Sequence, residues 1–596
     1  MTDLAPVEEP QEFRDEAVSE NYYGGGGTLI QISFSKATND PSVKSAVKEI
    51  QRLIESYDTA ITGAQQIELE EVMSRDQIRF ALVSLVLVTV VLLLTIPSIV
   101  VPVLFVITIG SAVAINLGLS YYLGQKLSYI TGVVVFALQF AVTMDYALFL
   151  YHRFEEERQN RDVADAMTVA IATTFKSVTA AAVTTVAGFL ALTVMHLQFG
   201  MDMGLTLARG VAITLVLVVM LLPSLLLEAL PLIDKVRHKV PRFDFSKLGR
   251  FVAKHAGVVS IIGVLLFVPA VIGNARINLT YNLNSSLPAD LPSMKGNTVI
   301  GEAFGRKESV FVVLEDTGSA VDLERLQASL EAVDGVTRVF GYSSLVDPRI
   351  PIEFVPAQAR ESFFANGYTY LGVDVAYGLD DPALAPTLDA IRRTAAATWP
   401  AESYVTGRPV LMNDMEQVSV GDADRINIIS IVAILIIVAL AFRSLSVPVA
   451  LVGIIQLAIL LNLAWESLRG NNLIFVASLA IGAIQLGATV DYAILITTRY
   501  EEELIRTRDR VKSITVAVAE SSQSILVSAM TMFAATIPLA VLSSVGIISD
   551  LTLLIARGAL ISLVIVIVLL PAVLVVGQPI FERTSIGWPK HAVKGD

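Results

Sequence analysis

Eleven stretches of this 596-residue chain are roughly 20 residues long and almost free of charged residues. Stretches of this length and polarity are typical of helices that cross a membrane. They lie at residues 78–97, 99–121, 128–151, 172–196, 203–230, 253–273, 425–442, 446–465, 472–497, 521–543 and 549–576. Only 17% of all residues are charged, and the mean hydropathy is +0.65. The sequence therefore predicts a polytopic α-helical membrane protein.

Basic residues in short connections predict which side of the membrane each segment faces. After the fifth stretch the chain carries Lys235, Arg237, Lys239, Arg242, Lys247, Arg250 and Lys254. Basic connections of this kind stay in the cytoplasm. A linker at 231–252 and a tail at 577–596 are therefore predicted inside, and residues 1–77 and 274–424 outside. The net charge of −13 gives no indication of a nucleic-acid partner.

The longer outer segment has the pattern of a soluble α+β domain. Apolar alternation predicts strands, and amphipathic periodicity predicts helices. Two strand–helix–strand units follow, with elements at 309–316, 321–333, 337–342, 368–378, 383–398 and 402–407. Two such units predict a ferredoxin-like βαβ sandwich. Residues 22–70 match the second unit only, so we expect a single strand–helix–strand half there, with elements at 27–36, 42–57 and 58–66.

The membrane part is duplicated. The stretch "QFAVTMDYALFLYHRFEEER" begins at Gln139, and "QLGATVDYAILITTRYEEEL" begins 346 residues later, at Gln485. Two tandem pseudo-symmetric bundles of five spans are predicted at 78–230 and 425–576, with residues 253–273 as the leading helix of the second repeat. Transporters often contain such repeats and place their site at the repeat interface. The first repeat lacks a leading span and the first strand–helix–strand unit, so we expect a late start of the gene or a fragment.

Each repeat carries an aspartate inside an apolar span, about six residues or roughly 9 Å from the cytoplasmic end of the helix. A carboxylate at this depth is costly, so Asp145 and Asp491 should face the bundle interior and serve a function. A buried carboxylate beside a second one holds a proton more readily than one in water, which favours proton exchange. Tyr146 and Tyr492 can donate hydrogen bonds to the charged form. The alternative is that these groups only join helices as polar contacts.

These residues resemble the MMPL family of the resistance–nodulation–division (RND) transporter superfamily. "GATVDY", from Gly487 to Tyr492, matches the family's GxxxDY motif, whereas "AVTMDY" has Ala141 in place of the glycine. "LNSSLPADLPS" also resembles the start of the family's outer porter domain. The resemblance implies that the two aspartate helices face each other and that Asp145, Tyr146, Asp491 and Tyr492 form a proton relay. It also implies export driven by the proton-motive force.

Other polar residues of the spans are candidates for supporting this relay. Hydroxyls on the helices that follow the aspartate helices could bond to the relay or carry water, or could only pack and bond to their own helix. They are Ser177, Thr184, Ser524, Ser528 and Thr531. Arg209 and Arg557 recur in "LARG" and "IARG", and either pair with Asp202 and Asp550 or extend to the headgroups.

The sequence offers no metal or cofactor site. Cysteine is absent, the five histidines are scattered, and no phosphate-binding loop ending in Gly-Lys-Ser/Thr is present. His152 has Thr498 at the matching position of the second repeat, which argues against an essential role for it. The chain is therefore not expected to be an enzyme or to use a cofactor.

The favoured hypothesis is a proton-driven exporter of a lipid or other hydrophobic molecule, multi-pass in a bacterial plasma membrane. Membrane lipids, the substrate and protons are its expected partners. The sequence leaves open whether the chain also forms a homo-oligomer. The alternatives are a SecDF-like auxiliary of protein translocation, a membrane sensor of the sterol-sensing type, and an inactive fragment. Both intramembrane carboxylates are present, which disfavours the sensor.

Overall fold

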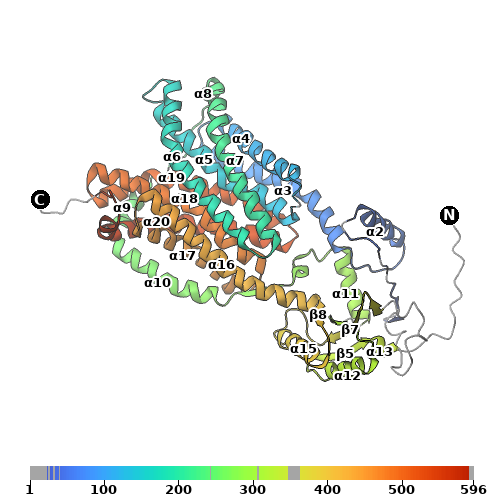
Figure 1. Ribbon diagram of the computed structural model, residues 1–596. Helices are drawn as coiled ribbons and strands as arrows, with labels where there is room; N and C mark the ends of the chain where they lie inside the picture. The colour runs from blue at the N-terminus through green and yellow to red at the C-terminus, as the bar shows by residue number, and fades with distance from the viewer. Residues whose placement is uncertain are drawn as a thin grey trace. The chain divides into compact units, whose positions relative to one another are not determined.

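The computed structural model describes residues 23–24, 27–30, 32, 34–38, 40–125, 127–241, 243–304, 308–345 and 363–589. The chain forms two compact units (Figure 1). We call residues 1–72 with 287–417 the outer unit, and residues 73–286 with 418–596 the membrane unit. Each unit is described by itself.

Long apolar helices build the membrane unit. Within the described residues, eleven helices are long and apolar enough to span a membrane. They are α3 (Gln65–Thr95), α4 (Val100–Tyr122), α5 (Tyr129–Glu157), α6 (Val163–Ala191), α7 (Gln198–Glu228), α10 (Ala256–Asn274), α16 (Arg408–Phe442), α17 (Ser446–Arg469), α18 (Phe475–Thr507), α19 (Arg510–Leu542) and α20 (Gly546–Thr584). The predicted polytopic fold is confirmed. Most helices extend past the predicted spans, because hydropathy excludes the charged residues at their ends.

The first helix of each five-span bundle touches its neighbours along a narrow stripe. In α3 the buried residues Ser84, Val88 and Leu92 follow a four-residue spacing, and in α16 Ser430, Ile434 and Val438 do the same. Residues four apart lie on one face of a helix, so only that face is covered by protein. The other faces carry exposed apolar side chains, as a lipid-facing helix requires.

Short elements complete the membrane unit. The connection after α7 forms α8 (Leu230–Lys235) and α9 (Ser246–Lys254), and the α6–α7 connection contains η2 (Leu192–Val194). The strand β3 (Asn278–Thr280) precedes η3 (Leu283–Ser286) and pairs in parallel with β9 (Asn472–Ile474). We call the end of the bundle that carries β3 and β9 the outer end, and the end that carries α8 and α9 the inner end.

The outer unit contains the predicted ferredoxin-like fold. Its sheet runs β5 (Val336–Gly341), β7 (Tyr368–Val375), β4 (Ser309–Glu315), β8 (Ser403–Gly407), and β6 (Phe364–Ala365) pairs with β7. All these pairings are antiparallel. If the four main strands are numbered in chain order, their order across the sheet is 2-3-1-4. Two interlocked βαβ units produce this order. The elements α11 (Pro292–Phe304) and α13 (Tyr342–Leu345) precede β4 and follow β5.

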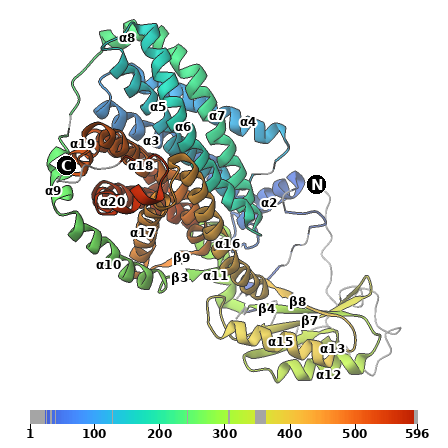
Figure 2. The same ribbon diagram turned by 60° about the vertical axis from the view of Figure 1, so that its left-hand side comes forward.

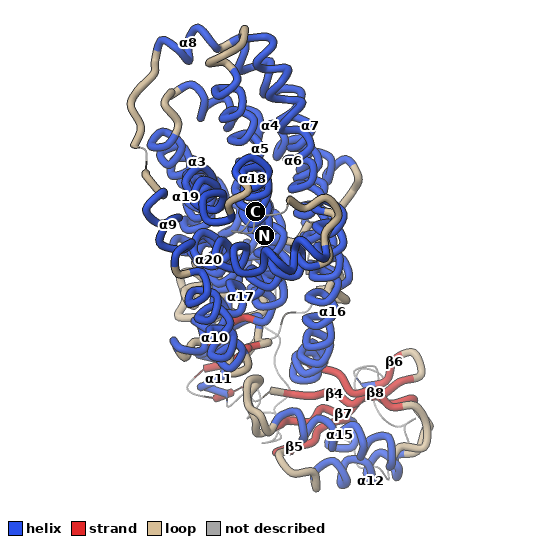
Figure 3. Tube along the Cα trace, turned by 90° about the vertical axis from the view of Figure 1, so that its left-hand side faces the viewer, coloured by secondary structure: helices blue, strands red, loops and turns tan. Residues whose placement is uncertain are grey.

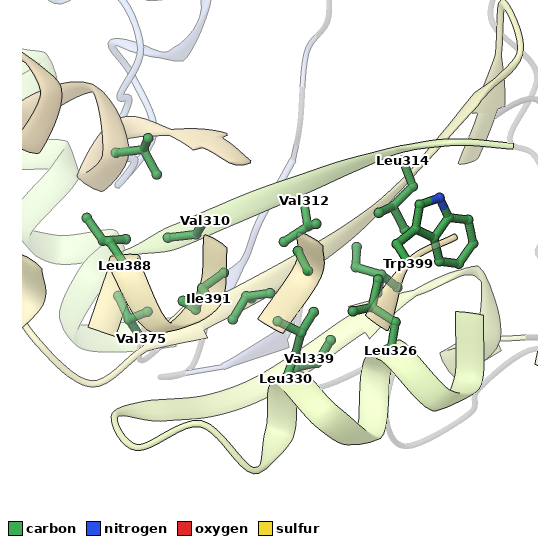
Figure 4. Close-up of a cluster of buried hydrophobic side chains, with 14 of the residues drawn as sticks. Val310, Val312, Leu314, Leu326, Leu330, Val339, Val375, Leu388, Ile391 and Trp399 are labelled. Carbon is green, nitrogen blue, oxygen red and sulfur yellow. The ribbon is translucent and has the colours of Figure 1, made fainter. Parts of the chain in front are cut away.

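Two helices, α12 (Ala320–Glu331) and α15 (Leu384–Thr398), lie against one face of this sheet (Figures 2 and 3). In β4, Val310, Val312 and Leu314 alternate with more exposed residues, so the strand has one apolar face. That face meets the apolar sides of α12 and α15 in a continuous core that includes Leu326 and Ile391 (Figure 4).

The predicted half-unit near the N-terminus is only partly correct. The helix is present as α2 (Pro41–Ile54), and Asp40 accepts a hydrogen bond from the Ser42 amide at its start. The strand predicted at 58–66 is absent from these described residues, which form a loop and the start of α3. The strand predicted at 27–36 lies partly outside the described residues, and β1 (Tyr23–Gly24) pairs only with β2 (Gly27–Thr28). A strand needs a partner, and no strand of the sheet from β5 to β8 pairs with this segment within the described residues.

Candidate functional site

The two aspartates lie in the most buried helices of the membrane unit. Within the most apolar 18-residue window of each helix, 89% of the α5 window and 94% of the α18 window is buried inside the protein. These are the highest shares among the membrane-spanning helices of the described residues. Asp145 and Asp491 are only 2% and 3% exposed. Figure 3 shows both helices in the interior of this unit, with other helices around them. Neither carboxylate therefore faces lipid.

The aspartate helices reach each other through the helices that follow them. The helix α18 packs against α6 of the first repeat, and α5 packs against α19 of the second repeat. The main contacts of α18 and α5 across the repeats are thus with α6 and α19, and the expectation that the two aspartate helices face each other stays a prediction. The α6–α18 contact is close because its residues are small, since a Cβ atom on Gly188 would lie 2.8 Å from the Cα atom of Gly487.

On the first side of this interface, residues of α6 bind the second aspartate helix. The Thr184 hydroxyl donates to Asp491 Oδ1 at 3.3 Å, and the Thr185 hydroxyl donates to the Gly487 carbonyl at 3.0 Å. The Tyr146 hydroxyl, from the first aspartate helix, donates to Thr185 at 3.4 Å. Threonines of α6 thus lie between Tyr146 of one repeat and Asp491 of the other.

On the second side, Thr531 of α19 matches Thr184 in sequence, but the hydroxyl at the site is that of Ser528, one turn earlier. It lies near both the Asp145 carboxylate and the Tyr492 hydroxyl. Among the described residues, Asp145 Oδ1, the Tyr492 hydroxyl and Ser528 Oγ have no hydrogen-bond partner. Buried polar atoms without partners are unusual and costly. This half of the site is therefore less completely bonded than the half around Asp491.

The aspartates and tyrosines of the two repeats lie within electrostatic range of each other across the interface. We call the combinations Asp145 with Tyr492 and Asp491 with Tyr146, each formed between the two repeats, the crosswise pairs. The two carboxylates also lie within electrostatic range of each other. Each repeat thus supplies the aspartate of one pair and the tyrosine of the other, so a relative shift of the repeats would alter both pairs.

The other hydroxyls singled out from the sequence are placed differently. Ser177 is exposed and donates to the Thr174 carbonyl at 3.0 Å, away from both aspartates. Thr531 is buried but donates to the Ser528 carbonyl at 2.8 Å, a bond within its own helix. Ser524 is half-buried, and its Oγ lies 3.4 Å from His152 Nδ1. Of the five, only Thr184 bonds to an aspartate within the described residues.

Arg209 and Arg557 belong to a polar network that the repeats share. Arg209 Nε donates to Asn116 Oδ1 at 2.7 Å, and Asn116 Nδ2 donates to Gln139 Oε1 at 2.8 Å. In the second repeat, Arg557 Nε donates to Asn462 Oδ1 at 2.7 Å, and Asn462 Nδ2 donates to Gln485 Oε1 at 2.9 Å. Each network joins three helices, and one of them is the aspartate helix, which contributes the glutamine.

The networks correct the predicted partners of the two arginines. Within the described residues, neither Asp202 nor Asp550 forms an ion pair with them, and Arg557 instead pairs with Glu466 at 2.6 Å. Each glutamine lies six residues before its aspartate, or about 9 Å along the helix. The networks therefore hold the aspartate helices in place rather than touching the carboxylates. Sequence reasoning missed Asn116 and Asn462, although both are amides at matching places within spans.

The second repeat has a charged cavity at its outer end. It measures about 340 Å³ and is lined by Glu466, Arg469, Asn471, Asp550 and their neighbours. Glu466 is 5% exposed, and the matching residue of the first repeat is Ser120. The ion pair of Glu466 with Arg557 thus has no counterpart in the first repeat.

This difference predicts unequal effects of removing the two arginines. Arg557→Met should destabilise the protein by about 3 kcal/mol or more, because it leaves the buried Glu466 carboxylate without its cation. Arg209→Met removes hydrogen bonds to neutral groups only and should cost less, about 1–2 kcal/mol. Thermal unfolding of the purified variants in detergent measures both. Equal losses would show that the Glu466 pair adds nothing to stability.

No group of three or more metal-binding side chains exists among the described residues.

Comparisons with known proteins place the chain among membrane proteins. The sequence model of the MMPL family matches residues 3–259 and 285–595. The chain is 27% identical to the membrane protein ActII-3 of Streptomyces coelicolor over 525 residues, covering 82% of this chain and 69% of that protein. It is 24% identical to the membrane protein YdfJ of Bacillus subtilis over 485 residues, covering 76% and 63%.

A solved structure also resembles this one. SecDF, a translocon-associated membrane protein from Thermus thermophilus, matches with a TM-score of 0.56 and 14% identity, covering 93% of this chain and 69% of that one. At this identity the likeness shows a shared fold alone. The chain thus spans about two thirds of the length of these relatives.

Proposed function

Because the chain belongs to the MMPL family of membrane transporters, we propose that it exports a lipid or another hydrophobic molecule and that protons moving inward drive the export. The observation that carries the proposal is the burial of Asp145 and Asp491, which are 2% and 3% exposed, in helices that each pack against a helix of the other repeat. Burying a carboxylate at this depth in a membrane costs free energy, which favours a functional role for the two aspartates.

The geometry supports coupling between protonation and movement. Removing the charge of Asp491 changes its interaction with Thr184 of the other repeat, which donates to it at 3.3 Å. Asp145 has an oxygen without a partner among the described residues, so its charged form is poorly stabilised. A proton that neutralises either carboxylate therefore changes the contacts between the repeats. Two packings of the repeats with different contacts are what an alternating-access transporter needs.

The cavity at the outer end is a candidate place for proton uptake. Glu466 and Asp550 line it, and loop charge assigns this end to the outside. The basic connections at the inner end, including Arg158, Arg161 and Arg237, agree with the cytoplasmic assignment. Protons would then enter at the cavity, reach the aspartates and leave at the inner end.

Proton flux into vesicles tests the proposal. The purified protein is placed in liposomes made from the total lipid extract of its own cells, which supplies a lipid substrate, and in liposomes of synthetic phosphatidylcholine. A trapped pH dye reports proton influx after the outside is acidified. We expect protein-dependent influx that is faster in the native lipids. Absence of protein-dependent influx in both would contradict a proton-driven mechanism.

Protein translocation is the rival function, since the chain shares its fold with SecDF. Fold alone does not determine function. A deletion strain separates the two hypotheses, because loss of a lipid exporter alters the lipids of the outer layers, whereas loss of a translocation auxiliary lowers the amount of secreted proteins.

The tyrosines are predicted to assist the relay without being indispensable. Tyr146→Phe and Tyr492→Phe should each slow proton-coupled transport by roughly tenfold, less than loss of an aspartate, because a water molecule can replace a missing hydroxyl. Proton influx in native-lipid liposomes measures the effect. Tyr151→Phe is the matched control, since Tyr151 lies on α5 outside the crosswise pairs. Equal rates in all three variants would remove the tyrosines from the relay.

A further inference from the structure

Below Asp145, two packed helices bury a column of polar residues that leads toward the inner end. His152 follows Asp145 by seven residues on α5, which places it two turns away, about 10 Å along the axis and on the same face. The helix α19 packs against α5 and carries Ser528, Ser524 and Ser521 at helical spacing on one face. The two rows run side by side because the helices are antiparallel neighbours.

Contacts and unpartnered atoms mark this column as polar throughout. Ser524 Oγ lies 3.4 Å from His152 Nδ1, so the histidine of one repeat meets the serine of the other. Asp145 Oδ1 and Ser528 Oγ have no hydrogen-bond partner among the described residues, and both residues are 2% exposed. Buried polar atoms of this kind favour bound water or rotating hydroxyls that complete a hydrogen-bonded chain.

The corresponding column below Asp491 lacks these features. Ala181 occupies the place of Ser528, and Thr498 occupies the place of His152. Ser177, the counterpart of Ser524, is exposed and bonds to its own helix. The duplication thus places an imidazole at this position below only one of the two aspartates. Because the second repeat has Thr498 at this position, the two repeats differ in the side chains that could carry a proton away from their aspartates.

We propose that His152 receives the proton that Asp145 releases and passes it to the inner end of the bundle. The inference rests on the proposed proton-driven function. The Asp145 carboxyl loses its proton to the chain of hydroxyls and water, in which each oxygen takes one proton and gives up another. Neutral imidazole accepts the last proton on one ring nitrogen and releases the proton of the other nitrogen. Imidazole is suited to this step because it has two ring nitrogens, so it can accept a proton at one and release a proton from the other.

The surroundings of His152 offer an exit. Glu156 lies four residues further on the same face of α5, and its side chain is 65% exposed. The other titratable neighbours are Tyr151, whose ring centroid lies 6.1 Å from the imidazole, and Asp145 two turns above. The side chain of α19 that touches His152 is the neutral Ser524.

Proton release after a pH jump tests the proposal without a known substrate. The full chain in lipid nanodiscs is transferred rapidly from acidic to neutral buffer, and time-resolved infrared spectroscopy follows the carboxylic acid band that Asp145→Asn removes. We expect His152→Asn, which keeps a hydrogen-bonding group for Ser524 but carries no proton, to slow the decay of this band by roughly tenfold to a hundredfold. His152→Glu, which again carries a proton, should restore most of the rate. Thr498→Val, at the matching place of the second repeat, should leave the rate unchanged.

The outcomes separate this proposal from the proposed function. An unchanged rate in His152→Asn overturns the role of His152 and leaves proton exchange at Asp145 standing. A slow rate in both His152→Asn and His152→Glu would assign the effect to packing and would also overturn it. If neither Asp145→Asn nor Asp491→Asn removes a carboxylic acid band at any pH between about 5 and 9, both proposals fail. Ser524→Ala provides a second variant, expected to slow release severalfold.

Discussion

Asp145→Asn and Asp491→Asn are each expected to abolish proton-coupled transport and to leave the protein folded. Asparagine has nearly the size of aspartate and still accepts a hydrogen bond, so Thr184 can keep its contact at position 491. The amide cannot exchange a proton, and one permanently neutral site interrupts the cycle. Proton influx into native-lipid liposomes, with thermal unfolding measured on the same samples, checks both halves of the expectation.

The result distinguishes a relay from a purely structural contact. Buried amides join helices in membranes readily, so polar contacts between helices would survive the change to asparagine. Asp202→Asn is the matched control, because Asp202 also lies in a span but belongs to neither crosswise pair. Transport at the wild-type rate by both relay variants would discard the relay and leave a structural role for the two carboxylates.

Much of the fold could be predicted because it depends on local patterns. Length and apolarity mark each membrane helix, and alternation marks strands such as β4 (Ser309–Glu315). The aspartates could be recognised because the duplication repeats them in register and because a carboxylate is conspicuous in an apolar run. The strand predicted at 58–66 was wrong because a strand also needs a partner edge, which a local pattern does not reveal.

The partners within the site could not be predicted from the sequence. Asn116 and Gln139 are uncharged and change the hydropathy of their spans little, yet they connect Arg209 to the first aspartate helix. The bond of Thr184 to Asp491 joins residues 307 positions apart. Such contacts depend on the rotation of each helix and on which helices cross, and both are decided by packing across the whole bundle.

The departure of the first repeat from the GxxxDY motif has a structural explanation. Gly487 meets Gly188 where α18 crosses α6. The matching positions of the other crossing are Ala141 on α5 and Ala535 on α19, and Ala535 lies beside Ala137 and Phe140 of α5. One crossing thus has two glycines and the other two alanines, so the helices can approach more closely where Thr184 and Thr185 reach the second aspartate helix.

Gly188→Ala is therefore expected to damage the protein far more than Gly487→Ala. A Cβ atom at Gly188 would lie 2.8 Å from Gly487 Cα and 3.2 Å from the Ala483 carbonyl oxygen. Both are backbone atoms that cannot turn aside, so α6 and α18 must separate. We expect a loss of about 1–3 kcal/mol in stability. Transport should fall by about a hundredfold, as a misplacement near 1 Å can cause.

Gly487→Ala is the matched control for Gly188→Ala, because it adds a Cβ atom on the other side of the same contact. A Cβ atom at Gly487 would lie 3.4 Å from both Gly188 Cα and the Thr185 carbonyl oxygen, which is ordinary van der Waals contact. Gly487→Ala should therefore behave nearly as the wild type, although it alters the motif residue itself. Thermal unfolding and proton influx of the two variants decide the matter. If Gly487→Ala were as harmful as Gly188→Ala, the motif glycine would be needed for more than the approach of α6 to α18.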